Sequence, residues 1–145
     1  PIASDCRPIH QQVQALLKVC PQTRVIRDAT RGGVATVVNE LVGNSALGAV
    51  LAESDVPVRQ AVRSICELLG FDPLWLANEG TFVAVVPADR SNAAVAALSA
   101  FPGSEDARII GRFTSSHPGM VALETLFGGE RTLDMPSGEL LPRIC

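Results

Sequence analysis

The amino-acid sequence predicts an α+β domain in which helices are layered on a mixed sheet. The first observation is size and composition: 145 residues, 47% hydrophobic and 19% charged, suit one globular domain and exclude a disordered chain. The second is that strand and helix patterns alternate through most of the chain. The third is a β-hairpin pattern near the end. Alternation followed by a hairpin is typical of a sheet with parallel and antiparallel neighbours.

Apolar periodicity places the individual elements. Helices are expected at residues 4–20, 33–43, 57–69 and 88–101, and strands at residues 23–27, 47–53, 81–86, 108–113, 120–126 and 131–133. The first helix has the N-cap signal Ser4-Asp5 and ends at Pro21. Gly70 follows the third helix, where a C-cap glycine belongs. A single helical turn is expected at residues 73–77.

The remaining segments are punctuated by glycine and proline. The strands at residues 47–53 and 81–86 are expected to be buried, and Pro87 ends the second. The hairpin turns across residues 127–130. Two prolines and one glycine fall in residues 136–145, which we expect to form an extended tail.

Charge and apolar run length exclude several classes of protein. The net charge of −3 argues against nucleic-acid binding, which normally needs a basic face. No apolar stretch approaches 18 residues, so no transmembrane helix is expected, and no segment has the pattern of a signal peptide. We therefore expect neither nucleic-acid nor membrane partners.

The four cysteines indicate a reduced, cytoplasmic protein. None forms a Cys-x-x-Cys pair, so no metal site is predicted. Cys6, Cys20 and Cys66 fall on predicted helices. Cys20 and Cys66 lie on apolar faces, where a packed thiol is the expected state. Trp75 is expected in the core or at an interface.

A glycine-rich loop, Asp-Ala-Thr-Arg-Gly-Gly at residues 28–33, joins a predicted strand to a predicted helix. Glycines permit close approach of a ligand to the backbone, and a helix N-terminus attracts anions. Arg31 adds positive charge, and Asp28 can accept from a hydroxyl or a metal-bound water. The pattern therefore fits a phosphate-binding loop. It also fits a plain strand-to-helix turn, and it lacks the Gly-Lys-Ser/Thr of a P-loop.

An acidic residue precedes the strand at residues 81–86. Glu79 lies in Leu-Ala-Asn-Glu-Gly, residues 76–80, with apolar sequence on both sides. Burial there would raise its pKa toward that of a general base. The alternative is a surface turn.

The sequence ends in Leu-Pro-Arg-Ile-Cys, residues 141–145. A thiol at the tip of a proline-containing tail suits a group carrier that visits two sites. The neighbouring α-carboxylate disfavours the Cys145 thiolate, and Arg143 offsets this in part. The alternative is a terminal cysteine without function. Prenylation is excluded because no three residues follow the cysteine.

Together these three motifs resemble the HypE family of hydrogenase maturation factors. Further similarity lies in residues 2–6, 34–40 and 133–139, so the resemblance covers essentially the whole chain. The Pro-Arg-Ile-Cys ending is its most specific part. The family shares a two-domain plan with aminoimidazole ribonucleotide synthetase, selenophosphate synthetase and thiamine monophosphate kinase.

The resemblance implies a division of the chain and of the complete protein. Residues 1–135 correspond to the C-terminal domain of that plan, an α+β layer with partial ferredoxin-like topology, and residues 136–145 to a flexible tail carrying the cysteine. The N-terminal domain, which binds most of the ATP and Mg²⁺ and forms the homodimer, is outside this sequence. The isolated chain is therefore expected to be inactive.

The resemblance also implies an activity. A carbamoyltransferase maturation factor loads a carbamoyl group onto the Cys145 thiol, ATP drives its dehydration to a thiocyanate, and the cyano group passes to iron in a complex of two further factors. Glu79 is the implied base. The implied nucleotide-facing residues are Asp28, Thr30, Arg31, Gly32 and Gly33. Two alternatives are a sister synthetase or kinase domain, and a non-catalytic docking module for maturation partners.

Overall fold

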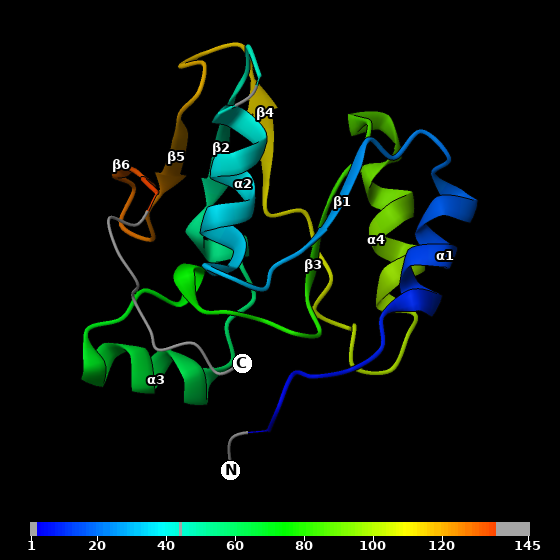
Figure 1. Ribbon diagram of the computed structural model, residues 1–145, viewed down its shortest axis with the longest axis horizontal. Coiled ribbons are helices and arrows are strands. Elements are labelled where there is room, and N and C mark those ends of the chain that lie inside the picture. The colour runs from blue at the N-terminus through cyan, green and yellow to red at the C-terminus, as the bar shows by residue number, and fades with distance from the viewer. Residues whose placement is uncertain (1–2, 44, 136–145) are drawn as a thin grey trace.

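The computed structural model describes residues 3–43 and 45–135, and it confirms the α+β prediction (Figure 1). The described residues form four helices: α1 (His10–Val19), α2 (Gly33–Gly43), α3 (Gln60–Leu69) and α4 (Ser91–Ser99). They form six strands: β1 (Val25–Asp28), β2 (Gly48–Ala52), β3 (Phe82–Val85), β4 (Gly111–Thr114), β5 (Val121–Glu124) and β6 (Glu130–Thr132). Three short 3₁₀ turns complete them: η1 (Glu53–Asp55), η2 (Pro73–Trp75) and η3 (Ala88–Arg90).

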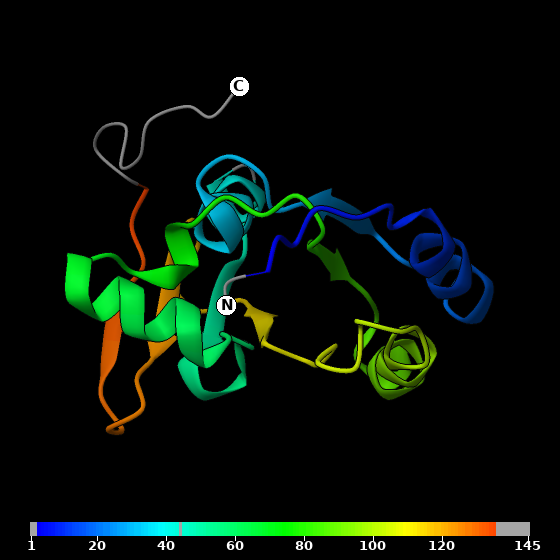
Figure 2. The same ribbon diagram turned by 90° about the horizontal axis from the view of Figure 1, so that it is seen from below.

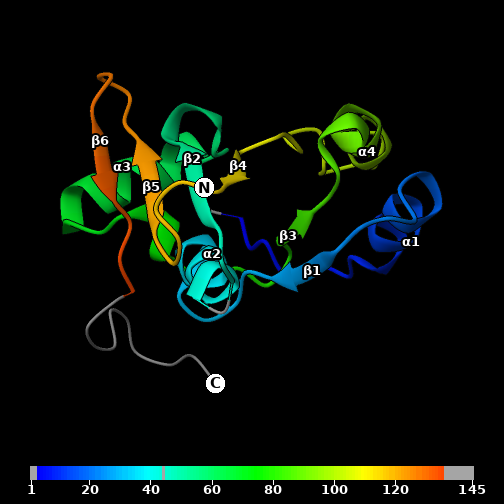
Figure 3. The same cartoon turned by 90° about the horizontal axis from the view of Figure 1, so that it is seen from above.

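The strands form two sheets. One has the order β4-β2-β5-β6, with β2 and β5 parallel and the other neighbours antiparallel, so it is the mixed sheet that the sequence predicts. The other consists of β1 and β3, paired antiparallel. Figure 3 shows this two-stranded sheet between α2 on one side and the α1–α4 pair on the other.

Each sheet has its own apolar core. The larger core joins α2, the mixed sheet and η2, and its fully buried members include Val42, Leu123 and Leu133. Trp75 packs against it, as predicted. The smaller core consists of Leu16, Cys20 and Ala94 between α1 and α4, packed against side chains of β1 and β3.

The prediction for the start of the first helix is wrong. α1 begins at His10, and residues 3–9 form neither helix nor strand. Pro8 disfavours helical geometry at the residue before it, and Asp5 bonds to a distant backbone amide instead of capping a helix. Cys6 is therefore exposed on a non-helical segment.

The other predicted elements are found, most of them with shifted ends. α2 matches its prediction, whereas β4 begins three residues later than expected, at Gly111. The alanine-rich helix divides into η3 and α4. β3 is half-buried rather than buried, because it has a single neighbouring strand. None of the helices in the described ranges combines the length and apolar character needed to cross a membrane.

Helix α3 ends as predicted, at Gly70 in the left-handed conformation with φ 72°. The helix presents apolar side chains to solvent. Leu68 is 83% exposed and Leu69 is 58% exposed, and Cys66 is the buried residue of the helix.

The N-terminal segment, residues 3–9, contacts two turns that are distant in sequence, the one before β3 and the one after α4. Figure 2 shows it in dark blue, running beside the green segment that leads into β3. The Arg7 guanidinium donates to the carbonyl oxygen of Gly80 (3.4 Å) and to that of Gly103, beyond α4. The segment therefore fastens the turn before β3 to the turn after α4.

Candidate functional site

The structure brings two of the predicted site segments together. The Ala29 amide donates to the carbonyl oxygen of Thr81 (3.0 Å), and the Asn78 amide donates to that of Ala29 (2.9 Å). These bonds extend the β1–β3 pairing beyond the strands. The glycine-rich loop and the Asn78–Glu79–Gly80 turn, about 50 residues apart in sequence, are thus adjacent in space.

The two glycines of the loop are required by its geometry. Gly32 and Gly33 have φ values of 68° and 61°, in the left-handed region. A Cβ on Gly33 would lie 2.4 Å from the carbonyl oxygen of Leu76 and 2.5 Å from that of Leu74. The start of α2 therefore packs directly on the backbone of η2, which side chains at Gly33 would prevent.

The polar residues of the loop remain accessible. Asp28 and Arg31 are exposed, and Thr30 is half-buried. α2 begins immediately after them, so its first backbone N–H groups and the Arg31 guanidinium lie at the same end of the helix. This arrangement suits an anionic group. Thr36 in the first turn of α2 also has a buried Oγ1 without a hydrogen-bond partner, below Gly32.

Asp72 holds η2 in place beneath the loop. Its Oδ1 accepts from the Leu74 amide (2.9 Å), which caps the turn, and its Oδ2 forms an ion pair with Arg131 of β6. On the other side of the loop, Arg27 of β1 pairs with Glu40 of α2 at 2.9 Å. Ion pairs thus join β6 to the start of η2 and β1 to α2.

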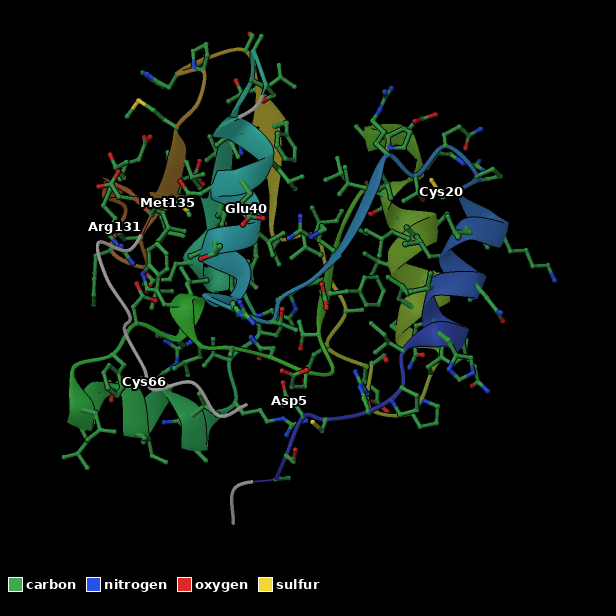
Figure 4. The ribbon with its side chains drawn as sticks, viewed as in Figure 1. Asp5, Cys20, Glu40, Cys66, Arg131 and Met135 are labelled. Carbon is green, nitrogen blue, oxygen red and sulfur yellow. The ribbon has the colours of Figure 1, made fainter. Side chains whose placement is uncertain are left out.

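Glu79 is exposed, so of the two interpretations left open for residues 76–80 the structure shows the surface turn and not a buried carboxyl group. What is buried is the neighbouring Gly80, on which a Cβ would lie 1.8 Å from the carbonyl oxygen of Asp5. The Glu79 amide donates to Asp5 Oδ2 (3.0 Å). The N-terminal segment therefore fills the space beside the turn and leaves the Glu79 side chain toward solvent. Asp5, labelled in Figure 4, is a residue of this site that sequence analysis assigned to a helix cap.

Cys145 and residues 136–145 lie outside the described residues. The chain immediately before them is described and is firmly held. Leu133 is fully buried, and its amide donates to the carbonyl oxygen of Val121 (2.8 Å). The Asn39 side-chain amide donates to the carbonyl oxygens of Leu133 (2.8 Å) and Ala35 (2.9 Å). Sequence analysis missed Asn39, which is one of three polar residues among the apolar residues of α2.

The buried cysteines match their predictions. Cys20 and Cys66 are both buried. Burial raises the pKa of the Cys66 thiol, and the nearby carboxylates of Asp72 and Glu67 raise it further. Across residues 3–43 and 45–135, no three His, Cys, Asp or Glu side chains gather in a way that would hold a metal ion.

Comparison with known proteins places this geometry in a family. Residues 2–123 match the family model described as "AIR synthase related protein, C-terminal domain". The chain belongs to this family. Its curated relatives confirm the resemblance to HypE: it is 45% identical over 144 residues to "Carbamoyl dehydratase HypE" of Azotobacter vinelandii and 42% identical to the protein of the same name from Escherichia coli K12. Each alignment covers 99% of this chain and 42% of the relative.

Solved HypE structures share the fold over nearly the whole chain. A "Crystal Structure of Hydrogenase Maturation Protein HypE" superposes with a TM-score of 0.92 at 44% identity, covering 98% of this chain and 46% of that one. A HypE structure "in complex with ATP" superposes with a TM-score of 0.91 at 40% identity, and the match covers 99% of this chain and 44% of that one. A chain of a "HypE-HypF complex" superposes with a TM-score of 0.88 at 38% identity, and the match covers 94% of this chain and 44% of that one. The chain thus spans less than half the length of these relatives.

Proposed function

We propose that this chain is the carrier-bearing part of an ATP-dependent carbamoyl dehydratase that makes the cyanide ligand of [NiFe] hydrogenase. In this proposal the Cys145 thiolate takes a carbamoyl group from a carbamoyltransferase partner. The γ-phosphoryl group of ATP is transferred to the carbamoyl oxygen. Loss of phosphate and of the nitrogen-bound protons then leaves a C≡N group on sulfur. The activation is needed because an amide oxygen is otherwise a poor leaving group.

The observation that carries the proposal is the convergence of three parts on α2. The glycine-rich loop precedes the first turn of this helix, the Glu79 turn is hydrogen-bonded to that loop, and Asn39 in the same helix fastens Leu133. Asn39 is six positions after Gly33, a rise of about 9 Å along a helix. Twelve residues follow Leu133, and an extended chain of that length reaches about 40 Å. This length is sufficient for Cys145 to reach the loop, which supports the proposal.

The start of α2 and Glu79 have distinct roles in this scheme. Arg31 and the first N–H groups of α2 receive phosphate oxygens, and Gly32 and Gly33 keep the backbone open to them. Glu79, exposed beside the loop, accepts protons from the carbamoyl nitrogen. Most of the ATP, with its Mg²⁺, is bound by the part of the complete protein outside this chain, which also forms the homodimer.

The partners follow from the chemistry. The relatives include a HypE solved with HypF, and for this chain we propose an equivalent partner as the carbamoyl donor. An iron-carrying complex of maturation factors accepts the cyano group. We place the whole sequence of reactions in the cytoplasm.

The test is the mass of the C-terminal peptide from the full-length protein incubated with the carbamoyltransferase, carbamoyl phosphate and ATP. We expect a gain of one carbamoyl group on Cys145, followed by an ATP-dependent loss of one water. Omission of ATP after loading should stop the reaction at the carbamoyl stage. An unmodified Cys145 in the presence of an active partner would reject the carrier role.

A further inference from the structure

We propose that Asp5 is a positioning residue for Glu79, which rests on the function proposed above for that carboxylate. The observation is the bond from the Glu79 amide to Asp5 Oδ2 at 3.0 Å. It joins residues 74 positions apart in sequence. Asp5 precedes α1 without capping it, and its side chain bonds instead to the turn at residues 78–80.

Every residue of the turn is held at the backbone by another segment. The Asn78 amide bonds to the glycine-rich loop, the Glu79 amide bonds to Asp5, and the Gly80 carbonyl oxygen accepts from Arg7. Gly80 also has no room for a side chain, because the Asp5 carbonyl oxygen occupies that space. The backbone of Glu79 is therefore fixed although its side chain is exposed.

The chemistry explains why such an arrangement is useful. A general base must be held within hydrogen-bond distance of the proton it removes, and an exposed glutamate on an untethered turn would sample many positions. A carboxylate that accepts from a backbone N–H forms one of the stronger hydrogen bonds in proteins. Asp5 thus fixes the Cα of Glu79 relative to the loop without covering its carboxyl group.

The test compares Asp5→Ala with Asp5→Asn in the full-length protein. Asparagine keeps an oxygen acceptor in the same place, whereas alanine removes it. For Asp5→Ala we expect dehydration of the loaded thiol to slow on the order of tenfold, with loading by the carbamoyltransferase unchanged. Asp5→Asn should restore most of the dehydration rate. Amide hydrogen exchange at Glu79 should accelerate in Asp5→Ala by a similar factor and remain slower in Asp5→Asn.

Ser4→Ala is the matched control. Ser4 Oγ accepts from the Cys6 amide (3.2 Å), so the variant removes one hydrogen bond from the same segment without touching the turn. It should dehydrate the loaded thiol at the normal rate. An equal loss of loading and dehydration in Asp5→Ala would indicate general damage and overturn the positioning role.

A Glu79→Gln variant separates failure of this inference from failure of the proposed function. Slow dehydration in Glu79→Gln together with a normal rate in Asp5→Ala would reject the positioning role of Asp5 and leave Glu79 as the proposed base. Normal dehydration in Glu79→Gln would reject Glu79 as the base, and the inference about Asp5 with it.

Discussion

The side-chain amide of Asn39 lies 2.8 Å from the carbonyl oxygen of Leu133, the last fully buried residue before the C-terminal ten. Asn39 lies about 1.7 turns into α2, whose first residue, Gly33, ends the glycine-rich loop. One helix therefore carries the loop at its start and, in its middle, the donor that holds the backbone at Leu133. Figure 4 labels Arg131, which lies in β6, and Met135, the last residue that the structure describes.

Loss of the Asn39 contacts should destabilise the domain. Asn39→Ala leaves the buried Leu133 carbonyl oxygen without this donor, and we expect the free energy of unfolding to fall by about 1–3 kcal/mol. Urea unfolding followed by circular dichroism measures the change. Asn92→Ala, at an exposed position of α4, is the control and should alter stability by no more than about 0.5 kcal/mol. Equal effects of the two substitutions would contradict a special role for Asn39.

A comparison of two glycines separates backbone strain from steric collision. Gly33 and Gly119 both have positive φ, but a Cβ on Gly119 meets nothing within 4 Å, whereas one on Gly33 would collide with η2. We expect Gly119→Ala to cost about 1–2 kcal/mol, which is the conformational term alone. Gly33→Ala should cost at least about 2 kcal/mol more, because the carbonyl oxygens of Leu74 and Leu76 must move. Similar unfolding midpoints for the two variants would show that η2 is not tightly packed on the loop.

Asp72 is expected to contribute more to the free energy of unfolding than its ion-pair partner, Arg131. Asp72→Ala removes both the cap on Leu74 and the pair with Arg131, for which we expect a loss of about 1–2 kcal/mol. Arg131→Ala removes a pair that is partly exposed to solvent, for which we expect less than about 1 kcal/mol. A double-mutant cycle gives the coupling between them. If Arg131→Ala proved the more damaging change, the cap would not be the main contribution of Asp72.

The cysteines should differ in reactivity. Because the pKa of the Cys66 thiol is raised, its thiolate population at pH 8 is smaller than that of an ordinary cysteine, and burial restricts access to it. Cys6 is exposed. We expect iodoacetamide to label Cys6 well before Cys20 or Cys66, with peptide mass spectrometry as the readout. Stabilisation that depends on a neutral Cys66 should be present below the ordinary thiol pKa and decline as the pH rises above it. Rapid labelling of Cys66 in the native protein would contradict this.

Several features were predictable from sequence because they depend on local pattern. The valine and leucine spacing of α2 placed that helix correctly, and the glycines of the loop indicated a tight strand-to-helix turn. The bond between Asp5 and the Glu79 amide was not predictable in this way, and neither was the start of α1. Asp5 bonds to a residue 74 positions away, and local sequence carries no signal for such a contact. The same reason applies to Asn39 and Leu133.

The carrier role proposed for Cys145 leads to the most direct prediction for the complete protein. Cys145→Ala removes the sulfur that would accept the carbamoyl group, and alanine offers no nucleophile, so loading by the carbamoyltransferase should be abolished. Cys6→Ser is the control, because it removes an exposed thiol at the other end of the chain and should leave loading unchanged. Intact-mass measurement after incubation with carbamoyl phosphate and ATP distinguishes the two. A carbamoyl group found on the Cys145→Ala variant would assign the carrier to another residue, and its loss in Cys6→Ser would assign it to Cys6.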